Sequence, residues 1–425
     1  MRVGGSLRVP GDKSITHRAL LLAAMTRGTS HIGGALTSLD ARSSARVLRQ
    51  LGAEISPLRS GEVLTIRGRG RLRRPDAVLD CGNSGTTTRL LLGLLAGHRL
   101  VATLTGDRSL RRRPMRRVTV PLGLMGARFE EPAGDGLPVT VHGGSLRPLR
   151  YEMPVSSAQI KSSLMLAGLA GAVNVDLREP AGRSRDHTER LLRAFGYGVE
   201  ETDGWIGFRP TGRLEPFDLQ VPGDPSSAAF LVGAAVLAES GVLRIAGVGV
   251  NPTRTWFLDV LRRMGATVAV EEETIHVGEP VADLVVRPAA LQATEVAAGE
   301  IPGLIDEIPL LAVLASRAPG TTVFRQVGEL RVKESDRLGL IAANLRAVGA
   351  IAEASGDDLH VTGGAAPPRG AVRTAGDHRL AMAFAVLGTL PGARLRIDDM
   401  ACAAVSFPDF PATLRAAGRG RGTAA

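Results

Sequence analysis

The sequence contains few of the residues on which several classes of protein depend. Among 425 residues there are two cysteines, Cys81 and Cys402, and only 3 % aromatic residues. Two cysteines cannot build a disulfide framework or a cysteine-rich metal site, and a reducing cytoplasm fits. Scarce aromatic rings leave few platforms on which nucleic-acid bases could stack. No apolar run approaches a membrane span, and the residues before Gly11 lack the apolar core of a signal peptide.

Lysine is also scarce, although the chain is basic. The formal net charge is +10, from 52 lysines and arginines against 42 acidic residues, yet only Lys13, Lys161 and Lys333 are lysines. An arginine-rich, solvated surface explains most of this charge, and such a field also attracts small anions. Because an ammonium group is compact and can transfer a proton when its pKa is shifted, the three lysines are candidate functional residues.

A short pattern, Leu-x-x-x-Gly, recurs six times and indicates internal repeats. Each copy ends an apolar-periodic segment with glycine where a helix C-cap is expected, and a β-hairpin pattern follows the first five. Ala266–Gly278 is one expected hairpin, and the strand-like Ser6–Val9 is expected to complete the last repeat. The six copies are Leu48–Gly52, Leu122–Gly126, Leu192–Gly196, Leu261–Gly265, Leu345–Gly349 and Leu414–Gly418.

The repeat spacing predicts an α/β protein with two domains. Six units of roughly 70 residues, each mixing helices and strands, group most simply as three per domain. We expect one domain at residues 13–223. The other should combine residues 1–12 with 224–425, with a frayed tail from Gly418 onward.

Polar clusters stand directly before several apolar helix patterns. A helix N-terminus attracts phosphate or carboxylate, although ordinary capping explains each cluster taken singly. Cationic side chains inside the first turns favour an anion site, and these are Lys13, Lys161, Lys333, Arg337 and Arg379. On one helix, Lys333, Glu334 and Arg337 would share a face, for which a solvated ion-pair surface is the alternative.

A series of motifs resembles the 3-phosphoshikimate 1-carboxyvinyltransferase family, also called EPSP synthases. The three main signatures are Gly11–Arg18, Gly82–Arg89 and Arg331–Leu338. Further matches, in family order, are Arg113–Pro114, Ser157–Ser162, Arg185–Glu189, Ile305–Glu307, Asp377–Arg379 and Ser406–Asp409. The resemblance runs from residue 10 to residue 410 and therefore covers nearly the whole chain.

The resemblance implies a two-domain inverse α/β barrel of the enolpyruvyl transferase type, with six β-α-β-α-β-β repeats. It implies transfer of the enolpyruvyl group of phosphoenolpyruvate to the 5-hydroxyl of shikimate 3-phosphate. Phosphate is released through a tetrahedral intermediate, in a cleft between the domains. No cofactor, metal, nucleic acid or membrane is implied as a partner, and a monomer is expected.

The resemblance also implies site residues. The catalytic set is Asp306 as base, with Glu334 and Lys13 as proton-transfer partners whose roles at the methylene carbon stay open. The shikimate 3-phosphate set is Lys13, Ser14, Arg18, Ser157, Ala158, Gln159, Arg185, Asp306 and Lys333. The phosphoenolpyruvate set is Lys13, Gly85, Arg113, Gln159, Arg337 and Arg379. Arginine suits the carboxylate and phosphate of phosphoenolpyruvate because its planar fork binds both.

Some positions resemble the second branch of the family, which includes glyphosate-tolerant members. Val405 and Glu329 stand where many members of the other branch carry lysine and asparagine. Gly85 keeps the space that tolerant members often narrow with alanine, so we expect appreciable inhibition by glyphosate.

Three alternatives to this interpretation exist, and the clustered lysines argue against one of them, a structural or interaction protein. UDP-N-acetylglucosamine enolpyruvyl transferases share the fold and donor, but they carry a reactive cysteine or aspartate in a loop and a Lys-Asn pair, whereas this chain has Lys13-Ser14. An RNA-binding or RNA-end-processing protein would also suit the charge and the repeat unit.

Overall fold

The computed structural model describes residues 1–180 and 182–419, which form two compact units. The first unit consists of Gly11–Val221 together with His276–Glu279. The second unit consists of Met1–Pro10, Pro222–Ile275 and the described residues from Pro280 onward. The chain thus passes from one unit to the other at residues 10/11 and 221/222, two residues before each junction that the sequence predicts.

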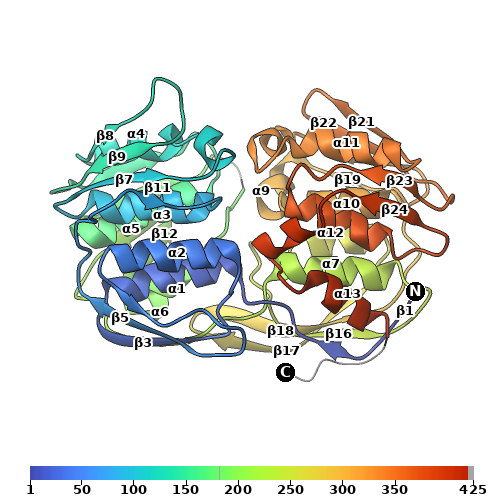
Figure 1. Ribbon diagram of the computed structural model, residues 1–425, viewed down its shortest axis with the longest axis horizontal. Helices are drawn as coiled ribbons and strands as arrows, with labels where there is room; N and C mark the ends of the chain where they lie inside the picture. The colour runs from blue at the N-terminus through green and yellow to red at the C-terminus, as the bar shows by residue number, and fades with distance from the viewer. Residues whose placement is uncertain (181, 420–425) are drawn as a thin grey trace. The chain divides into compact units, whose positions relative to one another are not determined.

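Three four-stranded sheets of one design make up the strands of the first unit (Figure 1). In each sheet a parallel pair is followed by an antiparallel hairpin whose second strand lies in the interior. The sheet orders are β14(Asp218–Gln220)-β3(Arg27–Gly33)-β5(Leu64–Arg69)-β4(Glu54–Ile55), β6(Leu79–Asp80)-β7(Val101–Thr105)-β9(Val139–His142)-β8(Arg128–Glu130) and β10(Leu149–Glu152)-β11(Val175–Arg178)-β13(Trp205–Arg209)-β12(Gly198–Thr202).

The second unit repeats this design with some reduction. It has two four-stranded sheets and two two-stranded ones among its described residues. The larger sheets are β17(Val268–His276)-β18(Glu279–Val286)-β16(Leu243–Gly249)-β2(Ser6–Leu7) and β19(Glu295–Val296)-β20(Thr321–Phe324)-β22(Asp358–Thr362)-β21(Ile351–Ser355). The smaller are β23(Arg369–Val372)-β24(Arg394–Ile397) and β1(Arg2–Val3)-β15(Ser240–Gly241).

The N-terminal strand β2 does not complete the last repeat, and that expectation was wrong. It pairs in parallel with β16, through Ser6 opposite Arg244 and Leu7 opposite Ile245, and so supplies the first strand of the fourth repeat. The first repeat obtains its corresponding strand from β14, which pairs in parallel with β3. The sequence pattern could identify a strand in each place, but strand pairing depends on chain crossings that the local pattern does not encode.

Each unit contains three helices that are buried almost all around. In the first unit these are α1(Lys13–Met25), α3(Gly85–Ala96) and α5(Ala158–Gly171), and in the second α7(Pro225–Val236), α10(Ile308–Ala315) and α12(His378–Leu387). Gly93 shows how closely α3 and α5 pack, because a Cβ there would lie 2.0 Å from the carbonyl oxygen of Ser163. A helix that is apolar on every side belongs in a core, which places helices inside and sheets around them.

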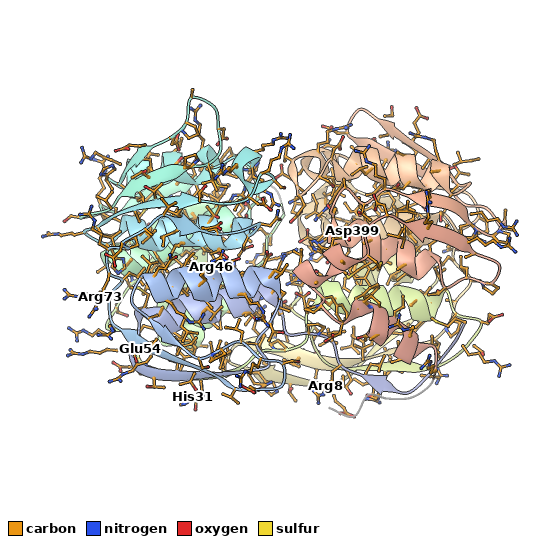
Figure 2. All side chains as sticks on the ribbon, in the orientation of Figure 1. Arg8, His31, Arg46, Glu54, Arg73 and Asp399 are labelled. Carbon is orange, nitrogen blue, oxygen red and sulfur yellow. The ribbon has the colours of Figure 1, made fainter. Side chains whose placement is uncertain are left out.

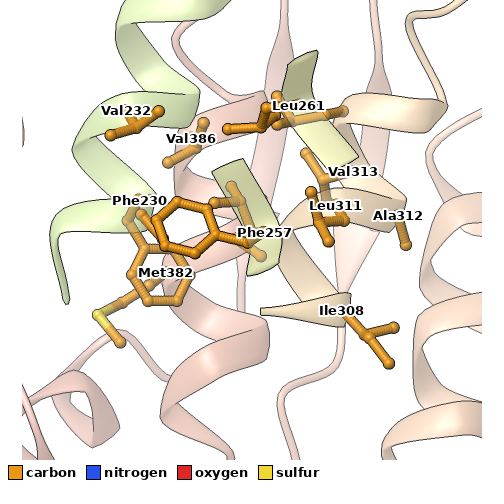
Figure 3. Close-up of a cluster of buried hydrophobic side chains, with 14 of the residues drawn as sticks. Phe230, Val232, Phe257, Leu261, Ile308, Leu311, Ala312, Val313, Met382 and Val386 are labelled. Carbon is orange, nitrogen blue, oxygen red and sulfur yellow. The ribbon is translucent and has the colours of Figure 1, made fainter. Parts of the chain in front are cut away.

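The core of the second unit illustrates this packing (Figure 3). Side chains from α7, α10 and α12 meet those of α8(Trp256–Arg263), and burial of each large apolar side chain stabilises the fold by roughly 1.5–3 kcal/mol. The labelled members are Phe230, Val232, Phe257, Leu261, Ile308, Leu311, Ala312, Val313, Met382 and Val386.

A second set of six helices ends at the repeated Leu-x-x-x-Gly pattern. These are α2(Leu39–Gln50), α4(Arg116–Leu124), α6(His187–Ala194), α8, α11(Arg337–Ala347) and α13(Phe410–Ala417). In the first five copies the glycine has φ between +84° and +112°. The residue after it donates its N–H to the carbonyl of the leucine, as Tyr197 does to Leu192 at 2.9 Å. This is a Schellman cap, so the prediction of helix ends is confirmed five times. The sixth glycine, Gly418, has φ −79° and forms no such cap.

The predicted hairpins after the first five copies are present, with one correction. The segment Ala266–Gly278 contains only one strand, β17, because the two-residue turn Val277–Gly278 leads into β18 beyond it. Both turn residues have positive φ, which is the conformation that tight hairpin turns favour.

Charged side chains cover the outside of the first unit. Arg73, Glu54 and His31 point outward in Figure 2. Glu54 forms an ion pair with Arg69 at 2.7 Å, and both side chains are exposed. Such pairs contribute little to stability, and they agree with a solvated basic surface. No helix among the described residues is long and apolar enough to cross a membrane.

Candidate functional site

The expected site residues fall into two groups, one in each unit. Lys13, Ser14, Arg18, Gly85, Arg113, Ser157, Ala158, Gln159 and Arg185 belong to the first unit, and Asp306, Lys333, Glu334, Arg337 and Arg379 belong to the second.

In the first unit, hydrogen bonds connect the N-terminal turns of the buried helices. His17 Nδ1 lies 2.7 Å from Ser44 Oγ, which lies 2.7 Å from Thr87 Oγ1. Thr87 in turn donates to Ser84 Oγ, the cap of α3. Burial lowers the pKa of His17 to about 3, so its imidazole is neutral at physiological pH. His17 therefore has a structural role in this chain of hydroxyl groups.

Arg18 joins α1 to α5 and α6 from a buried position. Its Nε donates to Thr188 Oγ1 at 2.7 Å, and its other nitrogens donate to Ser162 Oγ at 2.6 Å and to the carbonyl of Ser14 at 2.9 Å. Burial lowers the pKa of the guanidinium to about 10, and the nearby Arg185 charge also lowers it. The charges of Glu189 and Asp12 act in the opposite direction and favour the charged guanidinium.

Gln159 and Arg113 frame the start of α3 and its first residue, Gly85. Gln159 accepts from Arg89 at 2.5 Å and donates to Thr86 Oγ1 at 3.0 Å. Arg113 donates to Asn83 Oδ1 at 2.6 Å. A Cβ at Gly85 would lie 3.3 Å from guanidinium nitrogens of both Arg113 and Arg89, so glycine lets the backbone approach these groups closely.

Lys13 is the first residue of α1 and contacts Asp40. Its Nζ lies 3.2 Å from Asp40 Oδ2, and the side chain of Asp12 caps the helix by accepting from Ile15 N at 2.8 Å. At the start of α5, Ser157 occupies the N-cap position without a side-chain cap bond, and Ala158 follows it half-buried. Helix starts of this kind present N–H groups and a positive dipole end to an anion.

In the second unit, three carboxylates surround the guanidinium of Arg337. Its Nε lies 2.7 Å from Asp377, its Nη1 3.3 Å from Asp306 and its Nη2 2.5 Å from Glu334. Arg337 is 1 % exposed and Asp377 is fully buried, whereas Asp306 and Glu334 are partly exposed. The buried Asp377 thus holds one edge of the guanidinium, and the two expected catalytic carboxylates lie at its outer edge.

Arg379 approaches the same aspartate from α12. Its Nη1 donates to the main-chain carbonyl of Asp306 at 2.9 Å, and its Nη2 lies 3.5 Å from the Asp306 carboxylate. The backbone N–H of Arg379 donates to Asp377, which caps the helix. Asp306 therefore lies between the two arginines expected to bind phosphoenolpyruvate.

The expectation that Lys333, Glu334 and Arg337 share a helix face was wrong. A short 3-10 helix ends at Val332, and α11 begins only at Arg337 behind its cap Asp336. Lys333 and Glu334 lie between them in irregular chain, where the hydrogen bond between Glu334 and Arg337 is nevertheless made. Desolvation lowers the pKa of Lys333, although the charges of Asp306 and Glu329 act in the opposite direction.

The sequence motifs missed part of the network behind Asp306. Glu307 accepts a hydrogen bond from Ser226 at the start of α7, and Arg254 donates to the same hydroxyl at 2.9 Å. Arg254 lies in the loop after β16 and belongs to no motif that we identified. The only available signal was the cap-like sequence at Asp224, to which Arg254 also extends at 3.3 Å. Within the described ranges, no cluster of three or more histidine, cysteine or acidic side chains could hold a metal ion.

Comparison with solved structures defines the class of protein to which this fold belongs. The enolpyruvyl transferase NikO from Streptomyces tendae superposes with a TM-score of 0.80 at 21 % identity, over 98 % of this chain and 95 % of its own. EPSP synthase from Acinetobacter baumannii superposes with a TM-score of 0.86 at 37 % identity, over 98 % and 96 %. The fold is that of the enolpyruvyl transferases, a two-domain α/β fold.

The family follows from the sequence comparisons. The family model described as EPSP synthase (3-phosphoshikimate 1-carboxyvinyltransferase) matches residues 1–414. A 3-phosphoshikimate 1-carboxyvinyltransferase of Gloeobacter violaceus is 50 % identical over 96 % of this chain and 95 % of its own length. A 3-phosphoshikimate 1-carboxyvinyltransferase of Synechococcus elongatus is 48 % identical over 97 % of this chain and 93 % of its own length. The chain belongs to the EPSP synthase family.

Proposed function

We propose that the two groups of site residues act together on one pair of substrates. As an EPSP synthase, the chain transfers the enolpyruvyl group of phosphoenolpyruvate to shikimate 3-phosphate in the shikimate pathway. The observation that best supports this reaction is the position of Asp306 between Arg337 and Arg379 in the second unit. It joins a candidate base directly to two cations suited to a carboxylate and a phosphate.

Phosphoenolpyruvate would be bound by cations from both units. Arg337 and Arg379 would bind from the second unit, and Arg113 and Lys13 from the first, with the neutral amide of Gln159 beside them. Arg337 suits the carboxylate because Asp377 fixes its Nε edge and directs its other nitrogens outward. Gly85 would allow the donor to approach the backbone at the start of α3.

Shikimate 3-phosphate would be bound mainly by the N-terminal turns of α1 and α5. Its phosphate is a dianion, which the helix dipoles and cationic side chains both favour. From the first unit we assign Lys13, Ser14, Arg18, Ser157, Ala158, Gln159 and Arg185. From the second unit we assign Asp306 and Lys333.

The chemistry needs one proton removed and one delivered. The 5-hydroxyl oxygen would attack the substituted carbon of phosphoenolpyruvate while Asp306 takes the hydroxyl proton. Glu334 or Lys13 would protonate the methylene carbon. In the second step the tetrahedral intermediate loses phosphate and a methyl proton, which restores the double bond. Positioned acids and bases of this kind typically contribute 10²–10⁴-fold in rate.

The decisive measurement is phosphate release from phosphoenolpyruvate with two alternative acceptors. We expect release with shikimate 3-phosphate and none with UDP-N-acetylglucosamine. Lys13→Met and Asp306→Ala should each lower kcat by about 10² or more, because each removes a charged group from the reaction centre. Glu54→Ala is the matched control, because Glu54 lies on β4 and its ion pair with Arg69 is exposed. Full activity in Asp306→Ala would refute its role as base.

The same proposal includes the oligomeric state, the cellular location and the lack of nucleic-acid binding. Both groups of site residues come from one chain, which supports activity as a monomer. The two free cysteines, Cys81 and Cys402, suit a reducing cytoplasm, where we propose that the enzyme acts. The scarcity of aromatic residues argues against nucleic-acid binding. Sedimentation velocity with and without both substrates tests the monomer, and a stable dimer would contradict it.

A further inference from the structure

Lys161 is the one lysine for which the reaction provides no role. It lies in the first turn of α5, two residues after Gln159, and its side chain is 1 % exposed. Its Nζ lies 2.7 Å from Glu189, 3.0 Å from Glu179 and 3.3 Å from the carbonyl of Ser184. An ammonium group has three N–H donors, and three acceptors surround it here.

The two glutamates come from different parts of the third repeat. Glu179 follows β11 and is 6 % exposed, whereas Glu189 lies in α6 and is 1 % exposed. Glu179 also accepts from the backbone N–H of Ser184 at 3.3 Å. Both backbone groups of Ser184 are therefore held by the Lys161–Glu179 pair, and the next residue in the chain is Arg185.

The neighbours of this cluster contact the other cation of the proposed phosphate subsite. Ser162, next to Lys161, and Thr188, next to Glu189, both accept from Arg18. The Glu189 charge favours the charged form of the Arg18 guanidinium, and Arg185 opposes it. One buried ammonium group thus joins α5 and α6, which bear the hydroxyl acceptors of Arg18, to the segment that leads into Arg185.

We propose that Lys161 is a positioning residue that fixes Arg185, through Glu179 and Ser184, for binding the phosphate of shikimate 3-phosphate. This inference rests on the function proposed above. Solubility does not explain the cluster, because all three charges are buried. Stability alone explains it poorly, because buried ion pairs often stabilise no more than apolar residues of the same volume. Burial of three charges is better explained by the need to hold a fixed geometry.

Glu179→Ala is the first variant to make. It removes the acceptor of the Ser184 N–H, so that only the contact from Lys161 to the Ser184 carbonyl remains, and it leaves Lys161 and Glu189 as a balanced pair, so the fold should survive. We expect the Kd for shikimate 3-phosphate, measured by calorimetry, to rise about tenfold, which is the loss of one charge-assisted hydrogen bond. The KM for phosphoenolpyruvate should change less than about twofold. The matched control is Glu152→Ala, which removes an exposed partner of Arg178 in the same sheet.

A double-mutant cycle separates positioning from a general structural effect. Lys161→Met should weaken shikimate 3-phosphate binding at least as much as Glu179→Ala does. In an Arg185→Met background, both effects should disappear, because no guanidinium remains to be positioned. Effects of equal size in that background would overturn the proposal, as would an unchanged Kd in Glu179→Ala. If Lys161→Met fails to unfold cooperatively, the Glu179→Ala cycle decides alone.

The same experiments distinguish this inference from the function on which it rests. Wild-type protein that releases no phosphate with shikimate 3-phosphate would refute the proposed function. Normal turnover with unchanged binding in Arg185→Met would refute the role of Arg185, and with it the role of Lys161. A third outcome would refute the role of Lys161 alone. In it, turnover is normal, Arg185→Met weakens binding, and the effects of the two substitutions in the cycle on Kd are additive.

Discussion

Lys333 is a cation whose surroundings change how its charge depends on pH. Desolvation lowers the pKa of this half-buried lysine from the ordinary value of 10.5. In the proposed site the charged form of Lys333 would bind the phosphate, and a group with a lowered pKa loses its charge at a lower pH than usual. The free enzyme should therefore bind shikimate 3-phosphate less well as pH rises, and this loss should begin below pH 10.5.

We predict that kcat/KM for shikimate 3-phosphate falls on the alkaline side at a lower pH in wild type than in Lys333→Arg. Arginine remains charged across this range, so the alkaline limb should move upward by about one pH unit or more. The profile of kcat/KM against pH measures this directly. Identical alkaline limbs in the two proteins would show that another group titrates there.

Gly85 controls the space beside two arginines. A Cβ at this position would lie 3.3 Å from Arg113 and from Arg89, closer than most carbon contacts, so one guanidinium must move. We predict that Gly85→Ala raises the KM for phosphoenolpyruvate by roughly tenfold, the equivalent of about 1.4 kcal/mol.

Glyphosate gives a second measurement on the same variant. Wild type should be inhibited appreciably, and Gly85→Ala should raise the inhibition constant by a larger factor than the KM for phosphoenolpyruvate. A wild-type inhibition constant far above that KM would contradict the first expectation. Equal factors for the inhibitor and the donor would contradict the second.

At the scale of elements, the Schellman cap at Gly196 offers a test free of packing effects. Gly196 has φ +84°, and a Cβ there would meet no atom within 4 Å. Gly196→Ala should therefore lower the free energy of unfolding by about 1 kcal/mol through backbone strain alone. Gly123 lies inside α4, and a Cβ there would also meet no atom within 4 Å. Gly123→Ala should therefore raise the free energy of unfolding by roughly 0.5–1 kcal/mol. Denaturant unfolding measures both changes, and a shift of the same sign in the two variants would contradict the argument.

The elements that the sequence predicted well are those defined by local physics. Helix ends at Gly52 and Gly126 followed from the glycine pattern, because only the left-handed conformation closes that cap. The elements it missed depend on distant chain. Lys333 reads as part of the helix that follows, yet the cap at Asp336 starts α11 later. The pairing of β2 with β16 joins residues more than 200 positions apart, and no local signal encodes it.

The candidate site shows the same division. Motif resemblance provided the residues that would touch substrate, including both arginines beside Asp306. It did not provide Arg254 or the contact between Ser226 and Glu307, which act behind those residues. Such supporting contacts need only compatible shape and hydrogen bonding, and they therefore leave no fixed spacing in the sequence.

At the scale of the whole molecule, we predict that the two units move toward each other when shikimate 3-phosphate binds. Residues from both units are proposed to contact this one ligand, so its binding energy can favour a closed arrangement. Small-angle scattering should show a smaller radius of gyration with shikimate 3-phosphate than without it. Phosphoenolpyruvate alone at the same concentration is the comparison, and a radius unchanged by shikimate 3-phosphate would contradict closure.

The pairing of β2 with β16 also sets an order for folding during synthesis. Residues 11–221, with their own closing strand β14, form an insertion within the second unit. Residues 1–10 leave the ribosome before the inserted unit, but their partner strand in the chain, β16, ends only at Gly249. Domains generally fold as they are made, so the inserted unit can gather most of its structure while the N-terminal strand is still without a sheet. A strand synthesised before the inserted unit is thus among the last to find its place.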